Sequence, residues 1–181
     1  MDVPSTVARV WQNGSVLQIR LSRLDDRDEI WAILEPVLRA GETYTLPRDI
    51  SCARALAYWH RDDHEVFVAA DAGRILGTYF LRANQSGGGD HVANCGYMTS
   101  QGAQGRGVAR AMLEHSLARA RARGFLAMQF NFVVSTNLRA VKTWQAYGFE
   151  IVGRLPSAFK HPDQGFVDAL VMYKHLDPPT A

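Results

Sequence analysis

A glycine-rich turn between an apolar strand and a helix constrains the fold of this chain more than any other stretch. The pattern predicts an extended segment over residues 91–99, a turn over 100–107, and a helix that starts inside the turn at Gly105 and ends at Gly124. The first N–H groups of a helix lack intrahelical partners, and the helix dipole favours negative charge beside them. The sequence therefore predicts a site for a phosphate or pyrophosphate at this helix end.

The residues of the turn can be compared with the known kinds of phosphate-binding loop. Gly105 and Gly107 lack Cβ atoms, so a ligand can approach the backbone closely, and Arg106 and Arg110 add positive charge. A P-loop requires Lys and then Ser or Thr after its second glycine, whereas Val and Ala follow here. A dinucleotide fingerprint requires an acidic residue about 20 positions further on, and residues 126–131 contain none. A plain surface turn without a ligand is a further alternative.

Composition excludes several broad classes. A chain of 181 residues suits one domain, and 47% hydrophobic residues suffice for a real core. The net charge of +2 gives no electrostatic case for nucleic acid or a membrane surface. No apolar run approaches the roughly 18 residues that span a bilayer, and the N-terminus lacks a signal-peptide pattern, so we expect a cytoplasmic protein. Cys52 and Cys95 do not have metal-ligand spacing; we expect both reduced and no metal.

Hydrophobic periodicity predicts the other elements. Strands are expected over 16–22, 65–70, 74–82, 126–134, 149–155 and 166–174, and helices from Asp25 or Asp26 to Gly41, from Ser51, and from Ser135 or Thr136 to Gly148. The order along the chain is βααβββαβαββ, which predicts an α/β mixed sheet with helices on both faces. Residues 1–14 are expected to form an N-terminal arm or an edge strand, and residues 15–176 one domain.

A second motif lies on the helix after the fifth strand. Its members fit the pattern N-x-x-A-I/V-x-x-Y/W-x-x-x-G-F at Asn137, Ala140, Val141, Trp144, Gly148 and Phe149. The turn fits Q/R-x-x-G-x-G/A at Gln104, Gly107 and Ala109. With the strand order, the two motifs resemble the GNAT superfamily of acetyl-CoA-dependent N-acetyltransferases over residues 97–149. The resemblance implies the GNAT fold, N-acetyltransferase activity and acetyl-CoA as co-substrate.

The resemblance also implies which residues bind the coenzyme. They lie on the strand, in the turn with the first helical turn, and on the later helix: Met98, Thr99, Gln104, Gly105, Arg106, Gly107, Val108, Ala109, Arg110, Asn137, Ala140 and Trp144. The strand is expected to separate from its neighbour and to direct a backbone N–H of Met98, or of a residue next to it, at the thioester oxygen. Asn137 is expected to cap its helix, to contact a pantetheine amide, or both.

The general acid and general base of the family have no obvious counterparts. Many GNAT enzymes have a tyrosine where this chain has Trp144, and an indole N–H is not a usable acid. Tyr147, Tyr97 or a water molecule could replace it, and a thiol with a pKa of about 8.5 leaves tolerably well near neutral pH. No glutamate occurs between Glu65 and Glu114. The remaining base candidates, each more typical of a surface or hairpin position, are Glu42, Asp90, His91 and Asp168.

Two asparagines interrupt apolar strands that are expected to be adjacent. A buried asparagine must be hydrogen-bonded, so Asn94 and Asn131 are either structural bridges or substrate contacts. The surrounding stretches resemble a narrower branch that acetylates proline analogues such as azetidine-2-carboxylate, which implies catalytic and substrate-binding roles for both asparagines. Tyr44, in a loop over the acceptor groove in such folds, is a lid, a substrate contact or an exposed aromatic residue.

The expected substrate is therefore a small-molecule amine or an amino acid. A protein or peptide N-acetyltransferase and a non-catalytic coenzyme A sensor are the two alternatives. The sequence leaves a homodimer open.

Overall fold

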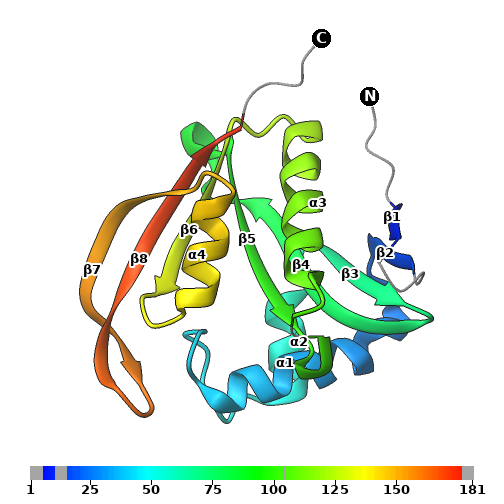
Figure 1. Ribbon diagram of the computed structural model, residues 1–181, viewed down its shortest axis with the longest axis horizontal. Helices are drawn as coiled ribbons and strands as arrows, with labels where there is room; N and C mark the ends of the chain where they lie inside the picture. Colours follow the sequence, from blue (N-terminus) through cyan, green and yellow to red (C-terminus); the bar gives the residue numbers. More distant parts are fainter. Residues whose placement is uncertain (1–5, 11–15, 104, 177–181) are drawn as a thin grey trace.

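The computed structural model describes residues 6–10, 16–103 and 105–176, and these form one eight-stranded sheet flanked by helices (Figure 1). The strands are β1 (Thr6–Val10), β2 (Val16–Leu21), β3 (Glu65–Asp71), β4 (Arg74–Ala83), β5 (Val92–Thr99), β6 (Ala127–Val134), β7 (Glu150–His161) and β8 (Gly165–His175). The helices are α1 (Arg27–Ala40), α2 (Cys52–Trp59), α3 (Val108–Ala122) and α4 (Leu138–Ala146). From β2 onward the predicted order is confirmed, and β1 pairs with β2.

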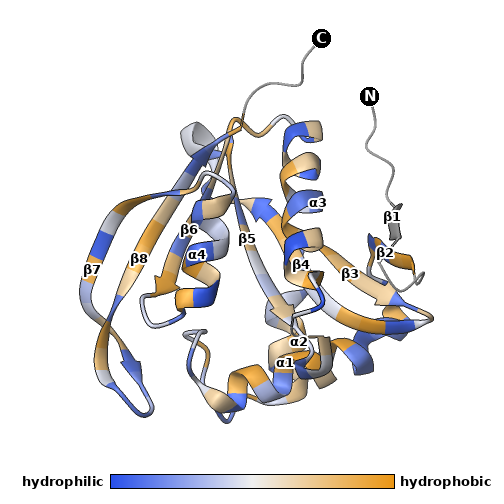
Figure 2. Ribbon diagram, in the orientation of Figure 1, coloured by the Kyte–Doolittle hydropathy of each residue, from blue (hydrophilic) through white to orange (hydrophobic). Residues whose placement is uncertain are grey.

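The sheet has the strand order β1-β2-β3-β4-β5-β6-β8-β7. All neighbours are antiparallel except β5 and β6, which are parallel because α3 crosses over between them. One hydrophobic core lies between the sheet and helices α3 and α4, and a second lies between the sheet and helices α1 and α2. Strands β3 and β4 are buried on both sides, which explains why β3 is hydrophobic along most of its length (Figure 2).

Side chains along β4 alternate between these two cores. Tyr79 and Leu81 belong to the core under α3 and α4, whereas Phe80 belongs to the core under α1 and α2. Residues directly opposite on β5 point to the same side as their partners. This alternation therefore tells which face of the sheet each β5 side chain occupies.

Helix ends differ in detail from the sequence expectations. Helix α3 begins at Val108 rather than Gly105, because Gly107 holds a left-handed conformation that interrupts the helix (φ 79°). Helix α4 is capped by Asn137 and not by Ser135 or Thr136, since the Asn137 side chain accepts a hydrogen bond from Ala140 N. The side chain of Asp26 does not cap α1; it binds Arg20 instead.

The hairpin of β7 and β8 is longer than expected. Strand β7 extends to His161, although Pro156 lacks an N–H group, because the pairing is interrupted between Leu155 and Phe159 and then resumes. A bulge accommodates the proline without ending the strand. Within the described residues, no helix is long and apolar enough to cross a membrane.

Strands β5 and β6 stay together for only two residue pairs. Val92 is opposite Ala127 and Ala93 is opposite Met128, and no pairing follows in the described residues of the two strands. The expected separation of these strands is thus confirmed. The edge of β5 that faces the gap, called here the split edge, is the centre of the candidate site.

Candidate active site at the split between β5 and β6

The pattern of hydrogen bonds between β4 and β5 determines which backbone groups of β5 face the gap. Asn84 N donates to Val92 O at 2.7 Å, and Ser100 N donates to Leu76 O at 2.9 Å. Because the register between β4 and β5 is continuous, every even-numbered residue of β5 bonds to β4. The odd-numbered residues Cys95, Tyr97 and Thr99 therefore direct their N–H and C=O groups at the split edge.

This hydrogen-bond pattern narrows the prediction of which backbone N–H of β5 would face the thioester oxygen. The N–H of Met98 points to β4, and its side chain is buried against α1 and α2. The neighbouring N–H groups of Tyr97 and Thr99 are the ones available at the split edge. The N–H groups of Tyr97 and Thr99 are each one residue away from that of Met98, and only the pairing of β5 with β4 shows which of them face the gap.

Tyr44 reaches the split edge from the loop after α1. Its hydroxyl donates a hydrogen bond to the carbonyl of Tyr97 at 3.0 Å. Burial is the largest cause of the raised pKa of the Tyr44 phenol, so this hydroxyl remains protonated and a donor. The contact excludes a fully exposed aromatic residue, and the roles of Tyr44 as a lid or a substrate contact remain predictions.

Gly96 makes this approach possible. A Cβ atom at Gly96 would lie 2.5 Å from the ring of Phe80 and 3.2 Å from the hydroxyl oxygen of Tyr44. The glycine therefore provides the space in which the Tyr44 loop and the Phe80 ring lie close to the backbone of β5.

The first turn of α3 presents unpaired amides. Ala111 N is the first to find a helical partner, at Gly107 O (3.0 Å), so the N–H groups of Val108, Ala109 and Arg110 lack one within the helix. The cap residue is a glycine, which has no side chain to satisfy them. Such a helix end attracts an anion through both its dipole and its donors. Gln104, the first residue of the motif, lies outside the described residues.

The glycines of the turn are required by conformation more than by space. Gly105 and Gly107 have φ values of 80° and 79°, which side-chain-bearing residues rarely adopt. Leaving out its chain neighbours, a Cβ atom at either position would meet no atom of the described residues within 4 Å. Arg106, between them, forms a 2.8 Å ion pair with Asp71 that ties the turn to the β3–β4 hairpin. Arg110 is exposed on the first helical turn.

Helix α4 closes the gap from the side of α3. Trp144 is 9% exposed, with its ring centroid 5.3 Å from that of Tyr97 on β5 and 5.0 Å from that of Phe130 on β6. The indole thus fills the space between the separating strands. Ala140 packs against the same core, and Asn137 caps the helix. Coenzyme contacts of these three residues remain a prediction.

The two tyrosines considered as alternative general acids, Tyr97 and Tyr147, both have hydroxyl groups that contact residues of α3. The Tyr97 hydroxyl lies 2.7 Å from Ser116 Oγ on α3, and burial raises the pKa of this phenol. The Tyr147 hydroxyl donates to Glu114. Neither arrangement directs a phenol at the split edge.

The two asparagines belong to one amide cluster, which comprises Asn84, Asn94, Gln129 and Asn131. Asn94 Nδ2 donates to Gln129 O at 2.8 Å, just beyond the last strand pair. Gln129 Nε2 donates to Asn131 Oδ1 at 2.7 Å, and Asn131 Nδ2 donates to Asn84 Oδ1 at 2.6 Å. Asn94 is therefore a structural bridge that satisfies a carbonyl where β5 and β6 separate.

The bridge fixes the orientation of the Asn94 amide. Since Nδ2 must face the carbonyl of Gln129, Oδ1 faces away from it. No partner for Oδ1 is found among the described residues, so this acceptor is available to a ligand. The sequence interpretation missed Asn84 and Gln129; the spacing of Gln129 and Asn131, two residues apart on one strand, was a usable signal.

All four base candidates lie outside strand β5 itself. Asp168 is held by Ser157 N at 2.9 Å and Arg154 at 2.8 Å, and these contacts lower the pKa of its carboxyl group. His91 and Asp90 precede β5 at its far end, and Glu42 is exposed in the loop after α1. Groups of His, Cys, Asp and Glu that could hold a metal ion are not found in the described part of the chain.

Comparisons with known proteins identify the family and the fold. The sequence model of the Acetyltransferase (GNAT) family matches residues 27–149. A GCN5-related N-acetyltransferase from Kribbella flavida is 38% identical, with a TM-score of 0.84 and coverage of 88% of this chain and 98% of that chain. The structure of yncA, a putative acetyltransferase from Salmonella typhimurium with its cofactor acetyl-CoA, is 20% identical with a TM-score of 0.78, covers 91% of this chain and 96% of that chain, and shows the fold alone.

A curated relative matches a shorter part of the chain. N-acetyltransferase aca1 of Schizosaccharomyces pombe is 28% identical over 103 residues, which are 56% of this chain and 49% of that protein. The match therefore spans about half the length of this relative.

Proposed function

The chain belongs to the Acetyltransferase (GNAT) family, and from this premise we propose that it transfers the acetyl group of acetyl-CoA to the amine of a small molecule or amino acid. The observation that carries the proposal is the combination of an uncapped α3 N-terminus with an unpaired edge of β5. The amides of Val108, Ala109 and Arg110 suit the diphosphate of the coenzyme. The open space beside Gly105 and Gly107 leaves room for it.

The acyl group would then lie at the split edge. Acetyl-CoA supplies a thioester, and the N–H of Tyr97 or Thr99 donates a hydrogen bond to its oxygen as negative charge develops there. The amine nitrogen forms a bond to the acetyl carbon, the carbon–sulfur bond breaks, and the proton lost by the amine is available to the thiolate. A thiol pKa of about 8.5 makes this departure feasible without a tyrosine acid.

Asn94 suits the acceptor amine. Its free Oδ1 is an uncharged acceptor that can hold an amine N–H close to the split edge. A neutral acceptor orients the nucleophile and stabilises its protonated form less than a carboxylate would. The resemblance of the stretches around Asn94 and Asn131 to the proline-analogue branch supports the narrower proposal that proline analogues, which are secondary amines, are among the substrates.

Thiol release from acetyl-CoA tests the proposal directly. A panel of amino acids, azetidine-2-carboxylate and short peptides is incubated with the protein, and acetyl-CoA binding is measured by calorimetry. Turnover with small amines supports the proposal, and turnover with peptides alone would indicate a protein N-acetyltransferase. Binding of acetyl-CoA without turnover of any amine would indicate a sensor, and no binding heat would overturn the proposal.

A further inference from the structure

We propose that Arg82 binds the carboxylate of the acceptor, so that the substrates of this site are α-amino or α-imino acids rather than simple amines. The inference rests on the proposed function and deepens it. Three features of the structure support it: the face on which Arg82 lies, the partners of its guanidinium, and the cavity beside it.

Arg82 lies on the same face of the sheet as the amide cluster. It is opposite Asn94 in the register of β4 and β5, and directly opposed residues in adjacent strands share a face. Phe80, two residues before Arg82, marks this face as that of α1 and α2. The side chain of Arg82 therefore starts about 5.5 Å from that of Asn94, at the point where β5 leaves β6.

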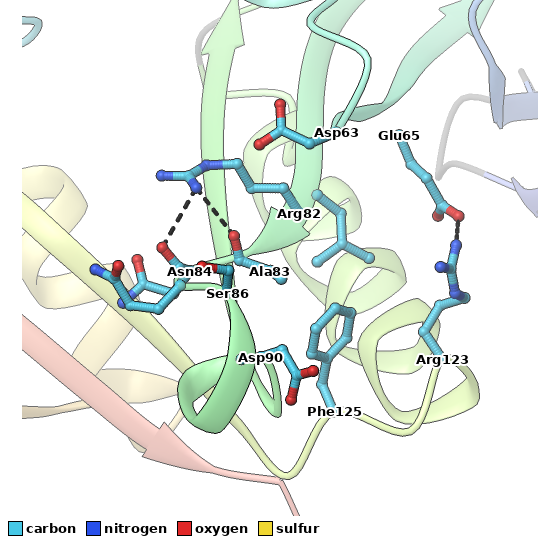
Figure 3. A pocket seen from close by; sticks show the side chains of 12 residues that line it. Asp63, Glu65, Arg82, Ala83, Asn84, Ser86, Asp90, Arg123 and Phe125 are labelled. Carbon is cyan, nitrogen blue, oxygen red and sulfur yellow. Dashed lines mark hydrogen bonds and ion pairs between the residues drawn. The ribbon is translucent and has the colours of Figure 1, made fainter.

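Among the residues that the structure describes, the guanidinium of Arg82 has only uncharged partners. Arg82 Nη1 donates to the carbonyls of Ala83 at 2.9 Å and Asn84 at 3.4 Å, as Figure 3 shows. No carboxylate in the described residues forms an ion pair with it. Asp63, drawn nearby, instead pairs with Arg61 at 3.3 Å. A guanidinium carries five donors in a fork that matches a carboxylate, so most of this capacity is available.

Two other partly buried arginines, Arg20 and Arg119, illustrate how a carboxylate partner compensates a guanidinium. Arg20 pairs with Asp26 at 2.7 Å, and Arg119 pairs with Glu65 at 2.9 Å. Removing a guanidinium partly from water is unfavourable unless a charged partner compensates. Arg82 is also partly buried, and no carboxylate of the described residues pairs with it, which favours an anionic ligand as its partner.

The guanidinium is accessible from solvent. A cavity of about 560 Å³ opens at this end of β4, and its lining includes Arg82, Asn84, Gln85, Ser86 and Asp90. Asn84 connects the cavity to the amide cluster, because its carbonyl accepts from Arg82 and its Oδ1 accepts from Asn131. A ligand can therefore reach Arg82 and the cluster together.

The two ends of an α-amino acid match these two groups. Its nitrogen and its carboxylate are separated by one carbon atom, and Oδ1 of Asn94 is an acceptor while Arg82 is a cationic donor. A secondary amine of the proline type, which has one N–H when neutral, needs only one acceptor. Arg82 then selects acids over the corresponding amides, because only an acid carries the charge.

Matched substrate pairs test the inference. Initial rates are measured with glycine, L-proline and L-azetidine-2-carboxylate and with the carboxamide of each, for the wild type, Arg82→Gln and Arg82→Lys. Arg27→Gln, an exposed arginine at the start of α1, is the control. We expect the wild type to prefer each accepted acid to its amide by at least about tenfold in kcat/KM, the size of one charge-assisted hydrogen bond.

Arg82→Gln is expected to lower kcat/KM for the acid by about the same factor and to leave that for the amide and the KM for acetyl-CoA unchanged. Arg82→Lys should restore part of the loss. Equal rates of the wild type with acids and amides, or equal losses with both in Arg82→Gln, would overturn the inference while acetyl transfer stands. Absence of turnover with these compounds and with every other small amine tested, despite folded protein in a thermal melt, would remove the proposed function itself.

Discussion

Replacing Gly96 by alanine is expected to disrupt the acceptor side of the split edge. The new methyl group would lie 2.5 Å and 2.8 Å from two ring carbons of Phe80, closer than real Cβ contacts allow. Phe80 is 4% exposed, is stacked on His64 at 4.1 Å and packs edge-on against Trp59 at 5.0 Å. The ring therefore cannot move aside freely.

The magnitude follows from two contributions. Overpacking of a filled core costs about 1 to 3 kcal/mol. The methyl group also approaches the Tyr44 hydroxyl to 3.2 Å, and loss of its hydrogen bond to Tyr97 costs about 1 kcal/mol more. We expect Gly96→Ala to lower the free energy of unfolding by about 2 to 4 kcal/mol.

Urea unfolding followed by tryptophan fluorescence measures this change, and acetyl-CoA turnover is measured on the folded variant. Gly88→Ala is the matched control, since a Cβ atom at Gly88 meets nothing within 4 Å and its φ is not positive. We expect the control to stay within about 0.5 kcal/mol of the wild type. In the double variant with Phe80→Leu, the smaller side chain should recover part of the loss. A Gly96→Ala protein as stable as the wild type would refute the packing argument.

Three further predictions concern α3 and α4. Gly107→Ala should raise the KM for acetyl-CoA beyond the effect of Gly165→Ala, because both glycines have positive φ with open space beside them but only Gly107 lies at the α3 N-terminus; equal KM values in the two variants would contradict an anion site there. Burial lowers the pKa of His115 to about 4, so the folded state resists its protonation and stability falls as the pH drops below 6.5. We expect the free energy of unfolding to fall by about 2 kcal/mol at pH 5, as measured by urea unfolding at each pH. This loss should be absent in His115→Gln. Trp144→Tyr should change kcat by less than about threefold, because a thiolate leaves without an acid; a large gain would show that the site lacks its acid and is degenerate.

Much of the fold could be predicted because local patterns and tertiary structure agree. Strand β3 is an apolar run between its two ends since helices cover both faces of the sheet, and the glycines around α3 have the positive φ values that the turn requires. The exact start of α3 was not predictable, because the conformation of Gly107 depends on how the turn closes. The cap of α4 was ambiguous for a related reason: Ser135, Thr136 and Asn137 all have the chemistry of a cap, and only the chain path selects Asn137.

The site shows where sequence reasoning stops. Asn94 and Asn131 could be identified because a polar residue in an apolar strand is conspicuous, but their connection through Gln129 requires the separation of β5 from β6. Which N–H groups of β5 face the gap depends on a register fixed by β4, and a shift of one residue would reverse the answer. The sequence around Arg82 does not mark it as a binding residue. Its proposed role follows from the absence of a carboxylate partner among the described residues, which only the fold shows. The residues proposed to bind the coenzyme can therefore be expected from a motif, whereas those that would select the acceptor arise from cross-strand neighbours that no local pattern specifies.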